Sequence, residues 1–259
     1  MSYLFYLLGL APSLIWLLFY LKKDKHPESN WMVLTTFLLG MAGALLILVL
    51  ELAVQALLNY LGAGITVLAQ NNSTYPQTAW LLANSHWLSL LISIFLAGAI
   101  IEEYIKYRTV RFWLKRNSEI DEPLDLMLYM IIGALGFAAM ENILVLHNQN
   151  FTAVLTTQSA FLIIGWRFIS ATFLHALCSG IIGFFWALSI CQTPNKKSYL
   201  GWGIVLAILL HGLYNWAIME GETLVKIIGP LFLLLVMSVF VSFGFNKLKK
   251  MKGVCLIKE

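Results

Sequence analysis

The chain has 259 residues, of which 60% are hydrophobic and only 12% are charged, and its mean hydropathy is +0.80. A water-soluble domain of this length has about twice that fraction of charged residues. The composition therefore excludes an ordinary soluble protein and indicates one whose main solvent is lipid. In such a protein the net charge of +4 bears on membrane orientation, and we expect no nucleic-acid partner.

Long apolar runs, rich in Leu and Ile and without the alternation of barrel strands, predict transmembrane helices. We expect an all-α, polytopic membrane helix bundle of about seven transmembrane helices. It would form a single domain over residues 1–259, with a motif-bearing core at about 84–219. The expected spans are Tyr3–Leu21, Trp31–Leu58, Trp80–Ile101, Leu124–Leu146, Phe161–Cys191, Leu200–Met219 and Val225–Phe245. The second and fifth are long, so we expect them to be tilted, broken or extended beyond the bilayer.

Basic residues predict the orientation, because cytoplasmic loops are enriched in Lys and Arg. If the N-terminus is outside and the C-terminus cytoplasmic, every basic cluster falls on the inner side, whereas the loops 61–79 and 147–158 contain no Lys or Arg. We therefore expect a multi-pass protein of the cell membrane with this topology. The clusters are Lys22, Lys23 and Lys25, then Arg108, Arg111, Lys115 and Arg116, then Lys196 and Lys197, then Lys247, Lys249, Lys250, Lys252 and Lys258.

Few ionisable residues occur in the predicted spans, and such residues usually face the bundle interior and mark function. Glu102 and Glu103 precede Lys106 by four and three residues, so both carboxylates can reach the ammonium on a helix. Burial or mutual repulsion would prepare one carboxylate to act as a general base or acid. The alternative is a salt-bridged charge cluster at the inner end of the third span.

Glu141 lies deep in the fourth span and has no basic residue near it in the sequence. The small residues Gly133 and Gly136 precede it and would let another helix approach closely. The alternative to a functional role is a protonated glutamate that makes one hydrogen bond between helices.

Two further spans contain histidines. His175 lies eight residues after Arg167, loosely on the same helical face, and Arg167 could neutralise a carboxylate across the bundle. His211 and Asn215 are four residues apart on one face, and Gly212 permits close packing beside the histidine. Each histidine could instead make an ordinary hydrogen bond between helices.

Together these spans bring two histidines and several carboxylates into one bundle. Such a set can bind a metal such as zinc, or it can activate water with a glutamate base while histidines stabilise an oxyanion. Either arrangement suits hydrolysis of an amide bond. The motifs Gly-x-Ser-x-Gly and His-Glu-x-x-His and the Gly-Asp pair of aspartyl intramembrane proteases do not occur.

The order of these motifs resembles the PrsW family of intramembrane proteases, distant relatives of the CAAX-prenyl and bacteriocin-processing proteases. The resemblance covers about Leu10 to Ile218. It is carried by Glu102-Glu103-x-x-Lys106, Phe137-x-x-x-Glu141-Asn142, His175 and His211-x-x-x-Asn215, together with Ala11-Pro12-Ser13 near the N-terminus.

The resemblance implies a peptidase that cleaves a membrane-anchored, single-span protein, the best-known case being an anti-sigma factor in bacterial envelope stress. Glu102 or Glu103 would be the water-activating base. Glu141, His175 and His211 would complete the catalytic site, as metal ligands or as contacts to the oxyanion. The expected substrate contacts are Lys106, Arg167, Asn142 and Asn215.

Two other functions stay open from the residues alone. A proton- or cation-coupled transporter could use Glu141, His175 and His211 as a relay, although the chain lacks the inverted repeat common in carriers. An inactive membrane scaffold or immunity protein could keep the same fold. The sequence indicates the lipid bilayer as surroundings but no oligomeric state.

Overall fold

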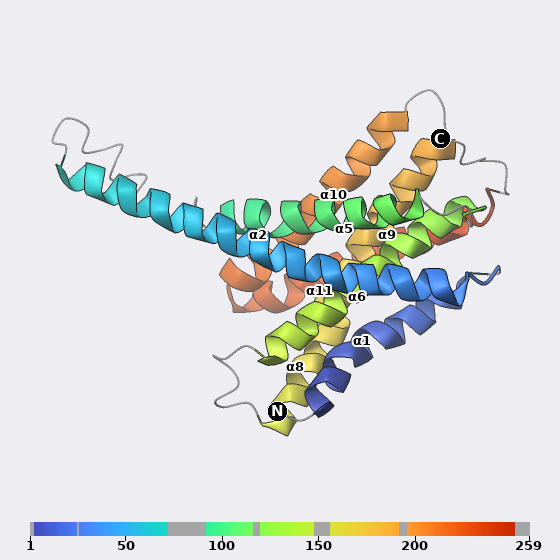
Figure 1. The fold of residues 1–259 in the computed structure, drawn as a ribbon, viewed down its shortest axis with the longest axis horizontal. Coiled ribbons are helices and arrows are strands. Elements are labelled where there is room, and N and C mark those ends of the chain that lie inside the picture. The colour runs from blue at the N-terminus through green and yellow to red at the C-terminus, as the bar shows by residue number, and fades with distance from the viewer. Residues whose placement is uncertain are drawn as a thin grey trace.

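The computed structural model describes residues 3–24, 26–71, 92–115, 120–147, 156–191 and 196–251, and these form helices and no strand (Figure 1). One helix, η1, is a π-helix. In chain order the elements are α1 (Tyr3–Leu21), α2 (Asn30–Asn71), η1 (Ile92–Ile100), α5 (Ile101–Leu114), α6 (Pro123–His147), α8 (Thr157–Ile169), α9 (Ala171–Cys191), α10 (Lys196–Glu220) and α11 (Thr223–Leu248).

Six helical segments of the described chain are long and apolar enough to cross a membrane, which confirms the predicted all-helical membrane bundle. Most of the expected third span, Trp80–Ile101, lies outside the described residues. The six segments are Tyr3–Leu21, Asn30–Tyr60, Pro123–His147, Thr157–Cys191, Ser198–Met219 and Thr223–Leu248.

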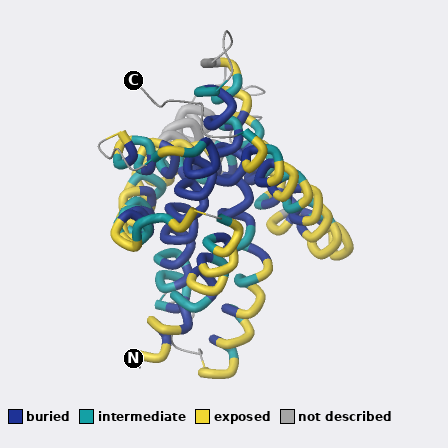
Figure 2. Tube along the Cα trace, turned by 90° about the vertical axis from the view of Figure 1, so that its right-hand side faces the viewer, coloured by how far each residue is buried: buried dark blue, intermediate teal, exposed yellow. Residues whose placement is uncertain are grey.

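Helix α6 forms the centre of the bundle. Every residue from Pro123 to Ala139 is buried, because apolar side chains cover all sides of this helix and leave no face for solvent or lipid. The helix packs against α9, α2 and α1. Figure 2 shows the buried segments in the interior and exposed ones on the outer helices.

Glycines let α2 and α6 approach closely. A Cβ added at Gly136 would collide with the backbone carbonyl of Phe37, and one added at Gly40 would collide with the carbonyl of Gly133. The two backbones are therefore in contact at this crossing. The predicted role of Gly133 and Gly136 is confirmed.

The long fifth span is broken, as expected. Helix α8 ends at Ile169, Ser170 adopts φ −114° and ψ −95°, and α9 begins at the next residue. The indole Nε1 of Trp16 donates to the Phe168 carbonyl at 2.9 Å, and the Ser170 hydroxyl donates to the Trp166 carbonyl. These bonds satisfy carbonyls at the break, as an irregular backbone within a membrane requires.

The long second span is extended, as expected, and the helix at the end of the third span continues further than expected. Helix α2 continues past Leu58 to Asn71, and the helix at the end of the third span continues past Ile101 to Leu114. The second difference bears on function, because it moves Glu102 and Glu103 from a helix end into the interior. They lie just after the π-helix η1, separated from it by Ile101. The π-helix is a rare conformation that, where it does occur, is often found at a functional site.

Candidate active site

Helix α5 brings three charged side chains into the bundle. Glu103 is fully buried, Lys106 is 4% exposed and Glu102 is 9% exposed. The Lys106 ammonium donates to Glu103 Oε1 at 2.7 Å and lies 3.2 Å from Glu102 Oε2. The predicted reach of both carboxylates to the lysine is thus observed, and the cluster is buried in the bundle instead of at a helix end.

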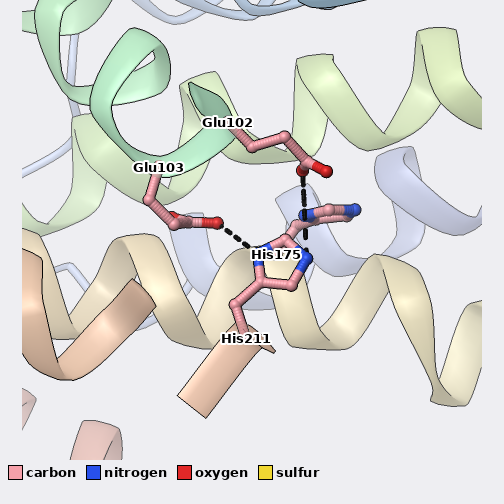
Figure 3. Close-up of side chains that lie close together, drawn as sticks. All are labelled: Glu102, Glu103, His175 and His211. Carbon is pink, nitrogen blue, oxygen red and sulfur yellow. Dashed lines mark hydrogen bonds and ion pairs between the residues drawn. The ribbon is translucent and has the colours of Figure 1, made fainter. Parts of the chain in front are cut away.

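Helix α10 adds His211 to this cluster. Its Nδ1 donates to Glu103 Oε1 at 2.7 Å, because an ionised carboxylate can only accept. Its Nε2 therefore faces the Glu102 carboxylate, 3.9 Å away (Figure 3). The lack of a side chain at Gly212 leaves room for the Phe95 ring, so the expected close packing beside His211 is also observed.

Helix α9 adds His175, and its hydrogen bonds define its tautomer. Lys106 has no acceptor, so its ammonium donates to His175 Nδ1, at 2.9 Å. The Nε2 nitrogen then carries the proton and donates to Glu141 Oε2 at 2.8 Å. The rings of His175 and His211 lie edge to face with centroids 5.3 Å apart.

Glu141 and Arg167 lie on the other side of His175. The Arg167 guanidinium pairs with Glu141 Oε2 at 3.0 Å and also donates through Nε to the side-chain carbonyl of Asn142. Asn142 in turn donates to the Thr172 hydroxyl at 3.1 Å. Arg167 thus neutralises a carboxylate across the bundle, as the sequence suggested, and Asn142 holds the arginine.

Similar depth in the bundle explains why these groups meet. The ends of α5 and α9 and the starts of α6 and α10 lie on one side, toward the right in Figure 1. Counted from those ends, Glu102, His175 and His211 lie 12, 16 and 15 residues deep, and Glu141 lies 18 residues deep. At 1.5 Å per residue these depths are about 18–27 Å. The extension of α5 to Leu114 makes this match possible.

A cavity of about 300 Å³ adjoins the cluster. Its polar wall includes two carboxylates, both histidines and Arg167, and its apolar wall includes half-exposed Trp166 and Ile218. Glu103 does not line it. The lining residues are Glu102, Glu141, Trp166, Arg167, Ser170, Ala171, Leu174, His175, His211, Tyr214, Asn215 and Ile218.

Comparison with known proteins identifies the family. Residues 28–243 match the family model described as PrsW family intramembrane metalloprotease. The chain belongs to this family. It is 28% identical to Protease PrsW of Oceanobacillus iheyensis over 227 residues, 88% of each chain, and 26% identical to Protease PrsW of Bacillus subtilis over 255 residues, 96% of each chain. Protease PrsW of Geobacillus kaustophilus is 33% identical over 129 residues, 49% of this chain and 52% of that protein. No solved structure matches.

Membership of the PrsW family confirms the resemblance noted in the motifs, and with it a membrane-embedded peptidase that acts on a membrane substrate. The transporter and the inactive scaffold predicted as alternatives receive no support from these relatives.

The family's description as metalloproteases raises the question of whether the cluster suits a metal. Glu102, Glu103, His175 and His211 each offer a ligand atom, all within 4.8 Å of one another. Each carboxylate also has a buried oxygen without a hydrogen bond. Two histidines and a carboxylate are a common catalytic zinc set, so the donor types fit.

The surroundings of both histidines agree with this fit. A metal-bound histidine usually donates its other N–H to a carboxylate, and here Glu141 accepts from His175 while Glu103 accepts from His211. Glu141, which we expected as a ligand, lies outside the group of possible ligands. The Lys106 ammonium contacts three of the four groups, so it provides a positive charge to the same donors.

Two residues near the site were missed in the sequence. Glu51 on α2 is half-buried and interacts electrostatically with Glu102 and Glu141. The signal was present, since Glu51 is a carboxylate inside an expected span, like Glu141. Tyr214 lies between His211 and Asn215 in the sequence and lines the cavity with them. An aromatic residue in a membrane helix gives no signal of this kind.

Proposed function

We propose that the chain hydrolyses a peptide bond in a single-span membrane protein, with Glu102 as the base that activates water. The observation that carries this proposal is the cavity beside Glu102. This carboxylate lines a space large enough for an extended peptide segment and a water molecule, and its exposed fraction of 9% leaves it accessible from there.

The other charged residues position and balance this base. Glu103 is fully buried and already accepts from Lys106 and His211, which supports a positioning role and not direct contact with water. The positive charge of Lys106 offsets the repulsion between the neighbouring carboxylates of Glu102 and Glu103 in an apolar interior. Glu141 holds His175 in the tautomer described above, and Arg167 offsets the charge of Glu141.

In the proposed reaction, Glu102 acts on one water molecule beside the scissile bond. Glu102 accepts a proton from water while the water oxygen bonds to the carbonyl carbon and the π electrons move to the carbonyl oxygen. The tetrahedral intermediate then collapses, the carbon–nitrogen bond breaks, and the proton on Glu102 passes to the leaving nitrogen. The immediate products are a carboxylic acid and an amine, and transfer of the acid proton to the amine gives a carboxylate and an ammonium. His211 and Asn215 border the same cavity and would contact the substrate there.

If zinc binds, it would be held by residues of the group Glu102, Glu103, His175 and His211, and any carboxylate that coordinates it would act as a ligand in place of a base. The metal would supply a Lewis acid that polarises the carbonyl and lowers the pKa of bound water. Metal content of the purified protein, measured by mass spectrometry for the wild type and His211→Ala, tests this point. Zinc in the wild type and its loss in the variant would support metal binding, whereas a zinc-free, active wild type would exclude it.

We further propose that the cavity opens toward the outer face of the membrane. Glu141 lies six residues before the end of α6, and Ile218 lies two residues before the end of α10. Both helices end at loops without Lys or Arg, the expected outer loops. With the N-terminus outside and the C-terminus cytoplasmic, this site would suit the outer segment of an anti-sigma factor.

A cleavage assay on purified protein tests the proposal. The substrate is a set of synthetic single-span peptides, with a fluorophore and a quencher on either side of the outer membrane boundary. Glu102→Gln should lower the rate about 10²–10⁴-fold, as expected for removal of a general base, while the melting temperature stays near that of the wild type. The matched control is Glu222→Gln, an exposed glutamate outside the cavity, which should cleave normally. Normal cleavage by Glu102→Gln would contradict the assignment.

A further inference from the structure

Tyr214 lines the cavity and has a buried hydroxyl with no hydrogen bond. The residue is 2% exposed, and it lines the cavity together with the proposed catalytic groups. Its hydroxyl lies near that of Ser170 but not in hydrogen-bonding geometry. The Ser170 hydroxyl donates to the Trp166 carbonyl instead.

A buried hydroxyl without a partner is unfavourable, and most buried polar groups in folded proteins have one. A phenylalanine would fill the same space without this cost. The hydroxyl therefore requires another explanation, and a bound substrate that supplies the missing partner is the explanation consistent with its place in the cavity wall.

The helical spacing puts this hydroxyl beside the groups of the reaction. Tyr214 follows His211 by three residues and precedes Asn215, so the three side chains share one face of α10 and all line the cavity. Asn215 is only half-buried, so its amide is less dependent on a substrate partner.

The two cationic side chains near the cavity are already paired with carboxylates, although Nη2 of Arg167 makes no hydrogen bond. Arg167 is bound to Glu141 and Asn142, and the Lys106 ammonium contacts Glu102, Glu103 and His175. The negative charge that develops on the carbonyl oxygen therefore needs a donor that is not already paired with a carboxylate. The Tyr214 hydroxyl meets this need.

We propose that the Tyr214 hydroxyl donates a hydrogen bond to the scissile carbonyl oxygen as that oxygen becomes an oxyanion. This inference rests on the proposed function, because it takes Glu102 and the adjoining cavity as the site of hydrolysis. It assigns Tyr214 a catalytic role beyond those of the glutamates and histidines. The bond is made in the transition state, so it should affect kcat and not KM.

Tyr214→Phe tests the proposal, in the single-span peptide assay described above. Loss of one oxyanion donor should lower kcat about 10²–10³-fold with KM unchanged. The melting temperature should equal or slightly exceed that of the wild type, because the deleted hydroxyl has no partner in the folded protein.

The matched control is Tyr129→Phe. The hydroxyl of Tyr129 donates to Glu28 and does not border the cavity. Its loss should lower the melting temperature and leave kcat unchanged, the opposite of the pattern expected for Tyr214→Phe.

Each other outcome overturns the inference. An unchanged kcat means that the hydroxyl is not used, a raised KM with unchanged kcat means that it binds only the ground state, and a fall in kcat together with the melting temperature indicates a structural role. If Glu102→Gln is inactive but Tyr214→Phe is normal, only this inference fails. If Glu102→Gln cleaves normally, the proposed function fails and this inference fails with it.

Discussion

Substitution of Lys106 by methionine removes the positive charge that two buried carboxylates share. At 2.7 Å from Glu103 Oε1, the Coulomb attraction is about 6 kcal/mol at an effective dielectric constant near 20. The net loss is smaller, because a carboxylate without its partner can take up a proton. At pH 7 this costs an ordinary glutamate about 3.7 kcal/mol, since its pKa in water is near 4.3. This protonation cost lies within the 3–5 kcal/mol typical of breaking a buried ion pair.

Thermal unfolding in detergent, followed by the fluorescence of the nine tryptophans, measures this loss. We expect Lys106→Met to lower the melting temperature by about 7–15 °C at pH 7. The cost of protonation falls by about 2.7 kcal/mol between pH 7 and pH 5, so the destabilisation should shrink to about 1 kcal/mol at pH 5. Lys226→Met, at an exposed position, is the matched control and should change little at either pH.

A double variant separates the lost pair from other effects. In the double variant Lys106→Met and Glu103→Gln, the negative charge of Glu103 is removed together with the lysine. The loss of unfolding free energy should therefore be smaller than the sum of the losses in the two single variants, by at least about 1 kcal/mol. A Lys106→Met protein that melts within about 2 °C of the wild type at pH 7 would refute the reasoning. So would a loss of equal size at pH 5 and pH 7.

Two further predictions concern the fold around the site. Gly136→Ala would place a Cβ against the α2 backbone and should lower the free energy of unfolding by about 1–3 kcal/mol. Gly201 has open space around it, so Gly201→Ala should be neutral or stabilising. Equal melting temperatures for the two variants would contradict the close crossing of α2 and α6. Burial raises the pKa of Glu28, so its ionisation opposes folding and stability should fall as the pH rises above about 4.5. Glu28→Gln should flatten this decline between pH 5 and pH 8 in melting curves, and an unchanged slope would argue against it.

The sequence alone was sufficient for the bundle and for most of the candidate site. The length of the apolar runs, and the absence in them of the polar–apolar alternation of barrel strands, predicted membrane helices. In lipid, the backbone groups of a helix must form hydrogen bonds within their own segment. Ionisable side chains are energetically unfavourable in a membrane, so the few in the predicted spans indicated a functional site. The spacing along one helix predicted that Lys106 would reach both glutamates. These are properties of one segment and its solvent, so no neighbouring helix is needed to infer them.

The partners of these residues depended on the tertiary structure. Nothing local indicates that the Lys106 ammonium donates to His175. Nor does it indicate that Glu141 binds the opposite nitrogen of that ring without itself belonging to the group of possible metal ligands. Likewise, the hydroxyl of Tyr214 lacks a hydrogen bond only because of the residues that pack around it.

The sequence by itself determined that this protein is a helical membrane bundle with acidic and imidazole groups inside it. Only the tertiary structure decided which of these groups meet, at which depth and through which atoms. The physical reason is that helix formation in lipid follows from short-range hydrogen bonding and hydrophobic length. The rotation and depth of each helix follow instead from contacts between segments far apart in the chain, such as the backbone crossing of α2 and α6 at Gly136.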